Sequence, residues 1–169
     1  MEKITKAPQR IFLKSVLSFV GLIILGFFSY FRAGLNKADL QKITGNINYL
    51  EKTFNNYPPA RNSGKCRYIR VDNYLDVFEI FIGKDKGDFA PVLEKIDSLR
   101  IGDEITVYVD NLISPQEDII NSNVRFIDRG NEPVFIRGNS LKNVAIFLVG
   151  LSALSLIGLV VLKKKGKIA

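Results

Sequence analysis

The sequence predicts a membrane protein in which two transmembrane helices flank a mainly-β (α+β) domain. Three observations lead to this fold class: two apolar segments long enough to cross a bilayer, alternating apolar and polar residues between them, and net charge concentrated at both outer ends. The expected segments are a basic cytoplasmic tail (1–10), a first helix (11–31), an extracytoplasmic domain (32–142), a second helix (143–162) and a second basic cytoplasmic tail (163–169).

The first helix is predicted by 21 residues whose only charge is Lys14, close enough to the start for its side chain to reach the membrane interface. A cleaved signal peptide is the alternative, because a basic leader precedes the segment. We favour the helix, since the apolar stretch exceeds the roughly 7–15 residues of a signal peptide and no A-x-A-like cleavage site follows Tyr30.

The second helix is predicted by 20 uncharged residues that end at three consecutive lysines, Lys163 to Lys165. The alternative here is a buried helix of a soluble protein. Such a helix shows a polar face, whereas this segment has only Ser152 and Ser155 near its middle. We expect the two helices to pack through small residues that allow close approach, namely Ser18, Gly21, Gly26, Gly150, Ala153 and Gly158.

The charge distribution predicts the orientation. The chain of 169 residues has 24 Lys and Arg against 17 Asp and Glu, but residues 32–142 contain 16 of each. The excess of +7 therefore lies outside the central region, and Lys and Arg near membrane spans are retained in the cytoplasm. Seven basic residues of the central region also lie near the spans, but long loops cross largely regardless of charge. We expect an integral protein of a bacterial inner or plasma membrane with both termini cytoplasmic.

The basic tails are expected to contact anionic lipid headgroups. The residues concerned are Lys3, Lys6, Arg10, Lys163, Lys164, Lys165 and Lys167. Because the central region is neutral overall, it has no general attraction for nucleic acid, and we expect none as a partner.

Composition excludes several kinds of chemistry. The chain has no His and a single cysteine, Cys66. Catalysis by imidazole, a metal site of His or several Cys, and an intramolecular disulfide are therefore excluded. We expect no cofactor and no metal.

Alternating apolar residues predict strands in the central region over 43–49, 66–71, 74–83, 104–111, 123–128 and 133–137. In the first of these, Ile43, Gly45, Ile47 and Tyr49 share one face. Asp72 and Asn73 are suited to a tight hairpin turn between the second and third strands.

One helix is predicted between the third and fourth strands. Phe89, Val92, Leu93, Ile96 and Leu99 follow a helical spacing. Asp88 is a candidate N-cap, Pro91 suits the first turn and Gly102 follows the end.

The resulting order is that of an OB-like (oligonucleotide/oligosaccharide-binding) barrel with five or six strands and one helix between strands 3 and 4. The alternatives are another small antiparallel barrel or an α+β sandwich, because the order of elements does not determine their pairing.

The start KITGNI, the turn Gly102-Asp103 followed by ITVYVDN, and the two flanking spans also resemble an uncharacterised bacterial family of small two-helix membrane proteins. The resemblance covers most of the chain. It implies an OB-like β module exposed in the cell envelope on a membrane hairpin, with no assigned activity and no catalytic residues to transfer.

The candidate binding surface is the one local excess of positive charge in the central region. In an OB barrel, the loop after strand 1 and the faces of strands 2 and 3 form the usual binding surface. The residues predicted to contact a partner are Tyr57, Arg61, Lys65, Arg67, Tyr68 and Arg70. We favour a protein, glycan or lipid headgroup as the ligand, and most of all another membrane or envelope protein.

We therefore expect a membrane-anchored, non-enzymatic binding module or an accessory subunit of a cell-envelope complex. One alternative is an envelope enzyme or cation-regulated protein that uses carboxylates in turns. The carboxylates are Asp85, Asp88, Asp103, Glu104, Glu117 and Asp118. A second alternative is a membrane immunity or inhibitor protein.

Overall fold

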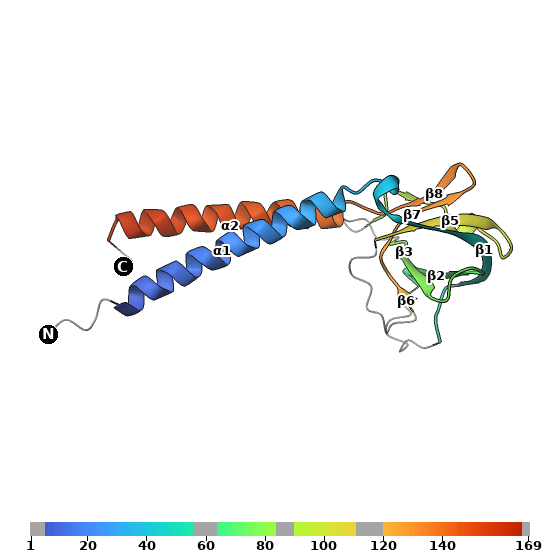
Figure 1. The fold of residues 1–169 in the computed structure, drawn as a ribbon, viewed down its shortest axis with the longest axis horizontal. Helices are drawn as coiled ribbons and strands as arrows, with labels where there is room; N and C mark the ends of the chain where they lie inside the picture. Colours follow the sequence, from blue (N-terminus) through green and yellow to red (C-terminus); the bar gives the residue numbers. More distant parts are fainter. Residues whose placement is uncertain (1–5, 56–63, 84–89, 111–119, 167–169) are drawn as a thin grey trace. The chain divides into compact units, whose positions relative to one another are not determined.

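The computed structural model describes residues 6–55, 64–83, 90–110 and 120–166. The chain divides into two compact units: residues 1–34 with 141–169 contain two long helices, and residues 35–140 contain a β domain. The helices are α1 (Lys6–Ala33) and α2 (Ser140–Lys164) (Figure 1). Over Ile11–Ala33 and Ser140–Lys164, both are long and apolar enough to span a membrane.

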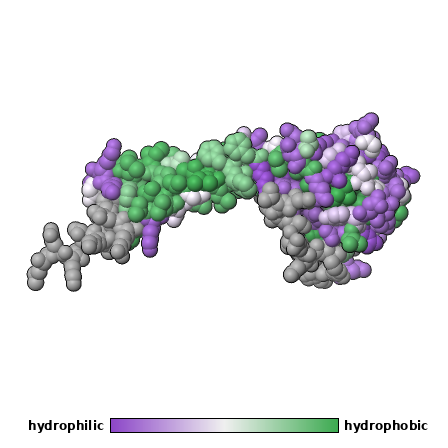
Figure 2. All heavy atoms as spheres, in the orientation of Figure 1, coloured by the Kyte–Doolittle hydropathy of each residue, from purple (hydrophilic) through white to green (hydrophobic). Residues whose placement is uncertain are grey.

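The two helices pack against each other in opposite directions. Near the end of α1, Gly26 lies against Ala145 and Val149 of α2. Near its start, the Phe12 ring has the Lys163 ammonium 4.1 Å from its centroid. Most large apolar side chains of both helices point outward, as the hydrophobic surface in Figure 2 shows. This exposure is what a hydrocarbon environment stabilises and water does not.

The β domain contains one mixed sheet of eight strands. Along the chain these are β1 (Gln41–Glu51), β2 (Cys66–Val71), β3 (Val77–Phe81), β4 (Leu93–Glu94), β5 (Glu104–Val109), β6 (Ile120–Asn121), β7 (Val124–Arg129) and β8 (Glu132–Ile136). Two short 3-10 helices, η1 (Lys37–Asp39) and η2 (Ile96–Ser98), complete the described elements. The strand order is β4-β8-β7-β5-β1-β2-β3-β6, with β3 and β6 parallel and every other pair antiparallel.

Strand β1 joins the two halves of this sheet. Its first half, from Gln41 to Asn46, pairs with β5, and its second half, from Ile47 onward, pairs with β2. At the junction, a Cβ on Gly45 would lie 2.5 Å from the Asp72 carboxylate and 3.1 Å from the Val71 Cβ. Only glycine allows β1 to approach β2 this closely.

The core consists of the residues that the strands turn inward. Ile47, Ile69, Phe78, Ile105 and Ile127 are each at most 1% exposed. In β1 and β5 these residues alternate with polar or more exposed neighbours, which explains why periodicity located these strands in the sequence.

The sheet is not the closed barrel of five or six strands that the sequence predicts. Its hydrogen-bonded order ends at β4 on one side and at β6 on the other. The reason is the short β6, which pairs with β3 only at Val77 and Phe78. At the opposite end, β8 and β4 extend the sheet beyond β7.

The helix predicted over 88–99 is also wrong for the residues that the structure describes there; Asp88 and Phe89 lie outside them. Leu93 and Glu94 form β4, because the edge of β8 accepts hydrogen bonds from the backbone of this segment. Val92 N donates to Ile136 O at 2.9 Å, and Lys95 N donates to Val134 O at 2.9 Å. Ile96 and Leu99 still enter the core, since a single 3-10 turn places positions i and i+3 on one side.

Candidate partner-binding surface

The residues predicted to contact a partner are in different environments. Tyr57 and Arg61 lie outside the described residues. Lys65 is exposed just before β2, and Arg70 is exposed within it. Arg67 and Tyr68 are buried, with exposed fractions of 4% and 0%, so neither offers a free surface to a partner.

Arg67 faces the core side of β2, where it pairs in register with Ile80. Its Nε and Nη2 donate to the two carboxylate oxygens of Asp97 at 2.6 and 2.9 Å, and Nη1 donates to the carbonyl oxygens of Gly64 and Cys66. The hydrogen bonds that Arg67 donates to Asp97 raise the pKa of Arg67. Arg67 therefore fastens η2 to β2 and has a structural role.

Tyr68 faces the outer side of the sheet but is covered. The ring of Phe54 stacks on it with centroids 5.7 Å apart, and Phe54 in turn meets Tyr49 edge to face at 6.4 Å. Tyr49 also donates from its hydroxyl to Thr53 O at 3.2 Å. These three rings form a packed aromatic layer on the outside of β1 and β2.

A β-bulge in β1 places Tyr49 in this layer. Ile47 pairs with Val71 and Tyr49 with Arg70, so Asn48 is the extra residue. The bulge reverses the alternation: Leu50 packs against the core, and Tyr49 faces outward rather than sharing the inner face with Ile47 as the sequence predicts. No residue pattern in the sequence marks this bulge.

Beside this layer, the half-buried Tyr49 and the exposed Asn48 and Arg70 form what we call the Tyr49–Arg70 surface. The Arg70 guanidinium carbon lies 6.0 Å from the Tyr49 ring centroid, and its Nε donates to Asn48 Oδ1 at 3.1 Å. Burial and the charge of Glu51 raise the pKa of Tyr49, and Arg70 opposes them. The surface thus presents an oriented cation above a neutral ring.

The last residues of β1 also help to line a groove of about 400 Å³. It is lined by Leu50, Glu51, Lys52, Arg67, Ile96 and Asp97. Charges of both signs border this groove, so it has no strong preference for an anion or a cation.

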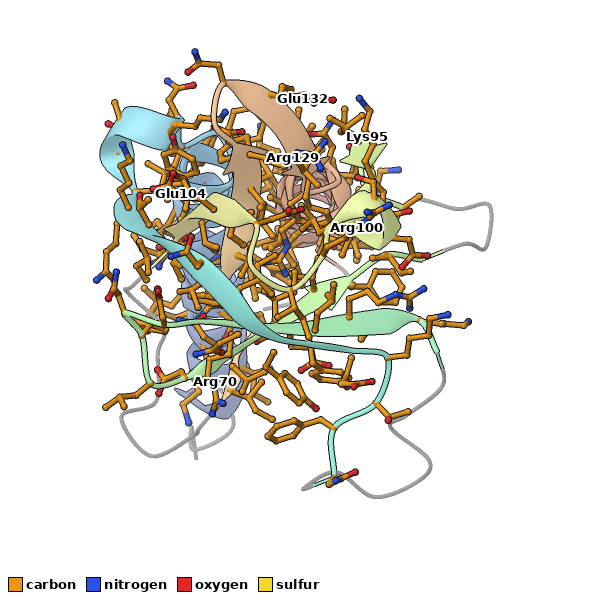
Figure 3. The ribbon with its side chains drawn as sticks, turned by 90° about the vertical axis from the view of Figure 1, so that its right-hand side faces the viewer. Arg70, Lys95, Arg100, Glu104, Arg129 and Glu132 are labelled. Carbon is orange, nitrogen blue, oxygen red and sulfur yellow. The ribbon has the colours of Figure 1, made fainter. Side chains whose placement is uncertain are left out.

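Of the carboxylates considered as an alternative site, Asp103 serves as a structural partner. Asp103 Oδ2 accepts a hydrogen bond from Arg100 N at 3.0 Å and lies 3.6 Å from Arg129 Nη1. Lys95 pairs with Glu132 at 3.0 Å and lowers its pKa. Figure 3 shows Lys95, Arg129 and Glu132 gathered at one side of the β domain, with Arg70 at the other.

The remaining carboxylates Asp85, Asp88, Glu117 and Asp118 lie outside the described residues, whereas Glu104 is exposed at the start of β5. Within the described ranges, no three His, Cys, Asp or Glu side chains are grouped so as to hold a metal ion.

Among the basic residues assigned to the tails, Lys163, Lys164 and Lys165 are exposed at the end of α2, and Lys6 and Arg10 belong to α1. Lys3 and Lys167 lie outside the described residues.

Of the small residues predicted to pack, Gly26 is buried against Val149 and Ala153 is half-buried. Ser18 is exposed and donates to Lys14 O on its own helix at 3.0 Å. A Cβ on Gly21, Gly150 or Gly158 would have no neighbour within 4 Å.

Comparison with known proteins adds no relative to this picture. No protein-family model, curated protein or solved structure matches the chain.

Proposed function

We propose that this protein is a membrane-anchored, non-enzymatic binding module of the cell envelope, which engages a partner through the Tyr49–Arg70 surface. The observation that carries the proposal is the fixed position of the Arg70 guanidinium, held by Asn48 above an aromatic ring. An exposed arginine usually samples many rotamers, so orienting it in advance lowers the entropy cost of binding.

The order of the longer strands supports an OB-like domain. On one side, β1 pairs with β2, β2 pairs with β3, and β3 pairs in parallel with β6. Two residues after β6 the chain enters β7. β7 then pairs with β5, and β5 pairs with β1. This is the order of the partly open OB barrel, in which ligands lie on strands 2 and 3. Arg70 lies on β2, which corresponds to strand 2.

The charge pattern supports the proposed orientation, with both termini cytoplasmic and the β domain outside the bacterial inner or plasma membrane. The partner we propose is another membrane or envelope protein. It would contribute a carboxylate or carbonyl group to Arg70 and a flat apolar group to Tyr49, the two contacts most often found at interface centres.

The test is site-specific photocrosslinking in intact membranes. A photoreactive residue is placed at Asn48 or at Arg70, and the control position is Thr106, which is half-buried on the other half of the sheet beside Thr44. We expect one discrete adduct from positions 48 and 70 and none from position 106. Equal adducts from all three positions, or none from 48 and 70, would contradict the proposal.

A further inference from the structure

A cavity of about 270 Å³ lies among residues of β2, β3, β7 and β8. The residues that line the cavity include Cys66 of β2, Glu79 of β3, Val124 of β7 and Arg137 just after β8. The β3 residue lies past Val77 and Phe78, where β3 pairs with β6. It is distinct from the Tyr49–Arg70 surface, so its role does not depend on the function proposed there.

Two arginines lie close enough beside this cavity for the charge of one to act on the other: Arg137 is on the lining, and Arg125 follows Val124 of the lining. Arg125 is 9% exposed, and its one ion pair among the described residues, from Nη2 to Asp110 Oδ2, is 3.5 Å long. Its Nε is buried and has no hydrogen-bond partner in the described part of the chain. Arg137 donates from Nη1 to the carbonyl oxygens of Ser122 and Val124 at 3.3 and 3.5 Å.

The backbone holds the two arginines together, because Arg137 N donates to Arg125 O at 2.9 Å. Burial lowers the pKa of Arg137, the charge of Arg125 lowers it further, and Asp110 opposes them. Buried charges in proteins are normally paired and fully hydrogen-bonded. Within the described residues, the two cations have one carboxylate in an ion pair, Asp110 at 3.5 Å, and Arg125 Nε has no hydrogen-bond partner. The Glu79 carboxylate also lines the cavity. A bound oxyanion would add an acceptor beside the two guanidinium groups.

The position of Arg137 in the chain suggests where that anion comes from. Only Gly138 and Asn139 separate it from Ser140, the first residue of α2. Three residue steps span at most about 10 Å, so Arg137 lies within that distance of the apolar helix. In a membrane-spanning protein this is the depth of the lipid headgroups, where phosphate groups are abundant.

We propose that this cavity binds a phosphate group, which contacts the guanidinium of Arg137 and is held by the positive field of Arg125. A planar guanidinium matches two phosphate oxygens with parallel hydrogen bonds, so arginine favours phosphate over a spherical anion such as chloride. The phosphate belongs either to an anionic phospholipid headgroup or to free inorganic phosphate, and the two sources are separated by experiment.

The alkylation rate of Cys66 reports occupancy of the cavity, because Cys66 lines the cavity and is the one cysteine of the chain. The full chain is placed in dodecyl maltoside micelles, which contain no phosphate, in a phosphate-free buffer of constant ionic strength, and the alkylation rate of Cys66 by a maleimide is recorded. One arm adds inorganic phosphate; the other adds phosphatidylglycerol to the micelles. Occupancy of the cavity should slow alkylation in a saturable manner.

The matched variants are Arg137→Gln and Arg129→Gln, which remove the same charge from different places. Arg129 is half-exposed and paired with Asp103 and Glu132. We expect Arg137→Gln to weaken protection about tenfold, as loss of a charged hydrogen-bond pair does, and Arg129→Gln to leave it unchanged. Arg137→Lys, which keeps the charge and loses the planar fork, should give an intermediate result.

Protection by phosphatidylglycerol but not by inorganic phosphate identifies the headgroup as the source, and protection by inorganic phosphate alone identifies the free ion. Protection by both supports a general phosphate site. Protection by neither in the unmodified protein overturns the proposal even where a variant fails to fold. Equal protection in Arg137→Gln and Arg129→Gln overturns it as well.

Discussion

Arg67 and Asp97 form a two-point ion pair, with Nε–Oδ1 and Nη2–Oδ2 distances of 2.6 and 2.9 Å. The arginine side chain is 5% exposed and the aspartate 48%. This pair joins β2 to the 3-10 turn that stands where the sequence predicts a helix. It therefore accounts for a basic residue that the sequence assigns to a binding surface.

Removing the aspartate should destabilise the β domain. Asp97→Ala leaves a buried guanidinium with only carbonyl partners, and since Asp97 is half exposed we expect a loss of about 1–3 kcal/mol rather than the full cost of a buried pair. Urea unfolding of the full chain in detergent, followed by tyrosine fluorescence, measures this. Lys95→Ala, which breaks the exposed pair with Glu132, is the control and should leave the midpoint unchanged. Equal midpoints for the two variants would contradict the assignment.

A methyl group at the junction of β1 should also be costly. Gly45→Ala places a Cβ 2.5 Å from the Asp72 carboxylate, whose Oδ1 accepts a hydrogen bond from Asn46 N at 2.9 Å. Relieving the overlap displaces that hydrogen bond, and we expect a loss of about 1–3 kcal/mol. The neighbouring Thr44→Ala, at an exposed position, is the comparison. A Gly45→Ala protein as stable as Thr44→Ala would show that the two strands separate without cost.

The helix pair can be tested through its glycines. Gly26→Leu should push α1 away from Val149, because even a Cβ at this position would lie 2.5 Å from the valine Cγ2. Gly21→Leu meets no neighbour and is the control. The measurement is crosslinking between cysteines at positions 30 and 142, where the Lys142 ammonium lies 5.2 Å from the Tyr30 ring centroid, in a Cys66→Ser background. We expect a lower yield for Gly26→Leu only; an equal decrease for both would point to general disruption.

Alkaline titration tests the coupling of Tyr49 to Arg70. The folded-state pKa of Tyr49 lies above its ordinary value of 10.0, with burial the largest cause, so folding favours the neutral phenol. The stability this contributes is fully present below pH 10 and is lost as the pH rises through the folded pKa. Arg70→Gln removes the cation that opposes the shift and should move one tyrosine transition to still higher pH, which ultraviolet difference spectra detect.

Tyr49→Phe identifies that transition by removing it, since burial also raises the pKa of Tyr74. A titration curve unchanged by Arg70→Gln would show that the guanidinium does not act on this ring in solution.

Local patterns in the sequence were sufficient for the two long helices and the six longer strands, but not for β4, β6 or the 3-10 turns. Two uninterrupted apolar segments determine the long helices, and period-two alternation determines the six longer strands, because both signals arise from neighbours along the chain. The spacing of Ile96 and Leu99 also correctly marked them as buried, although it predicted the wrong helix type.

The tertiary structure decided the features that concern function. The bulge at Asn48 exposes Tyr49, the pair with Asp97 buries Arg67, and the ring of Phe54 covers Tyr68. The approach of β8 to β7 brings Arg137 beside Arg125. Each depends on partners far apart in the sequence, and a periodic pattern states which residues are buried but not which residues they meet.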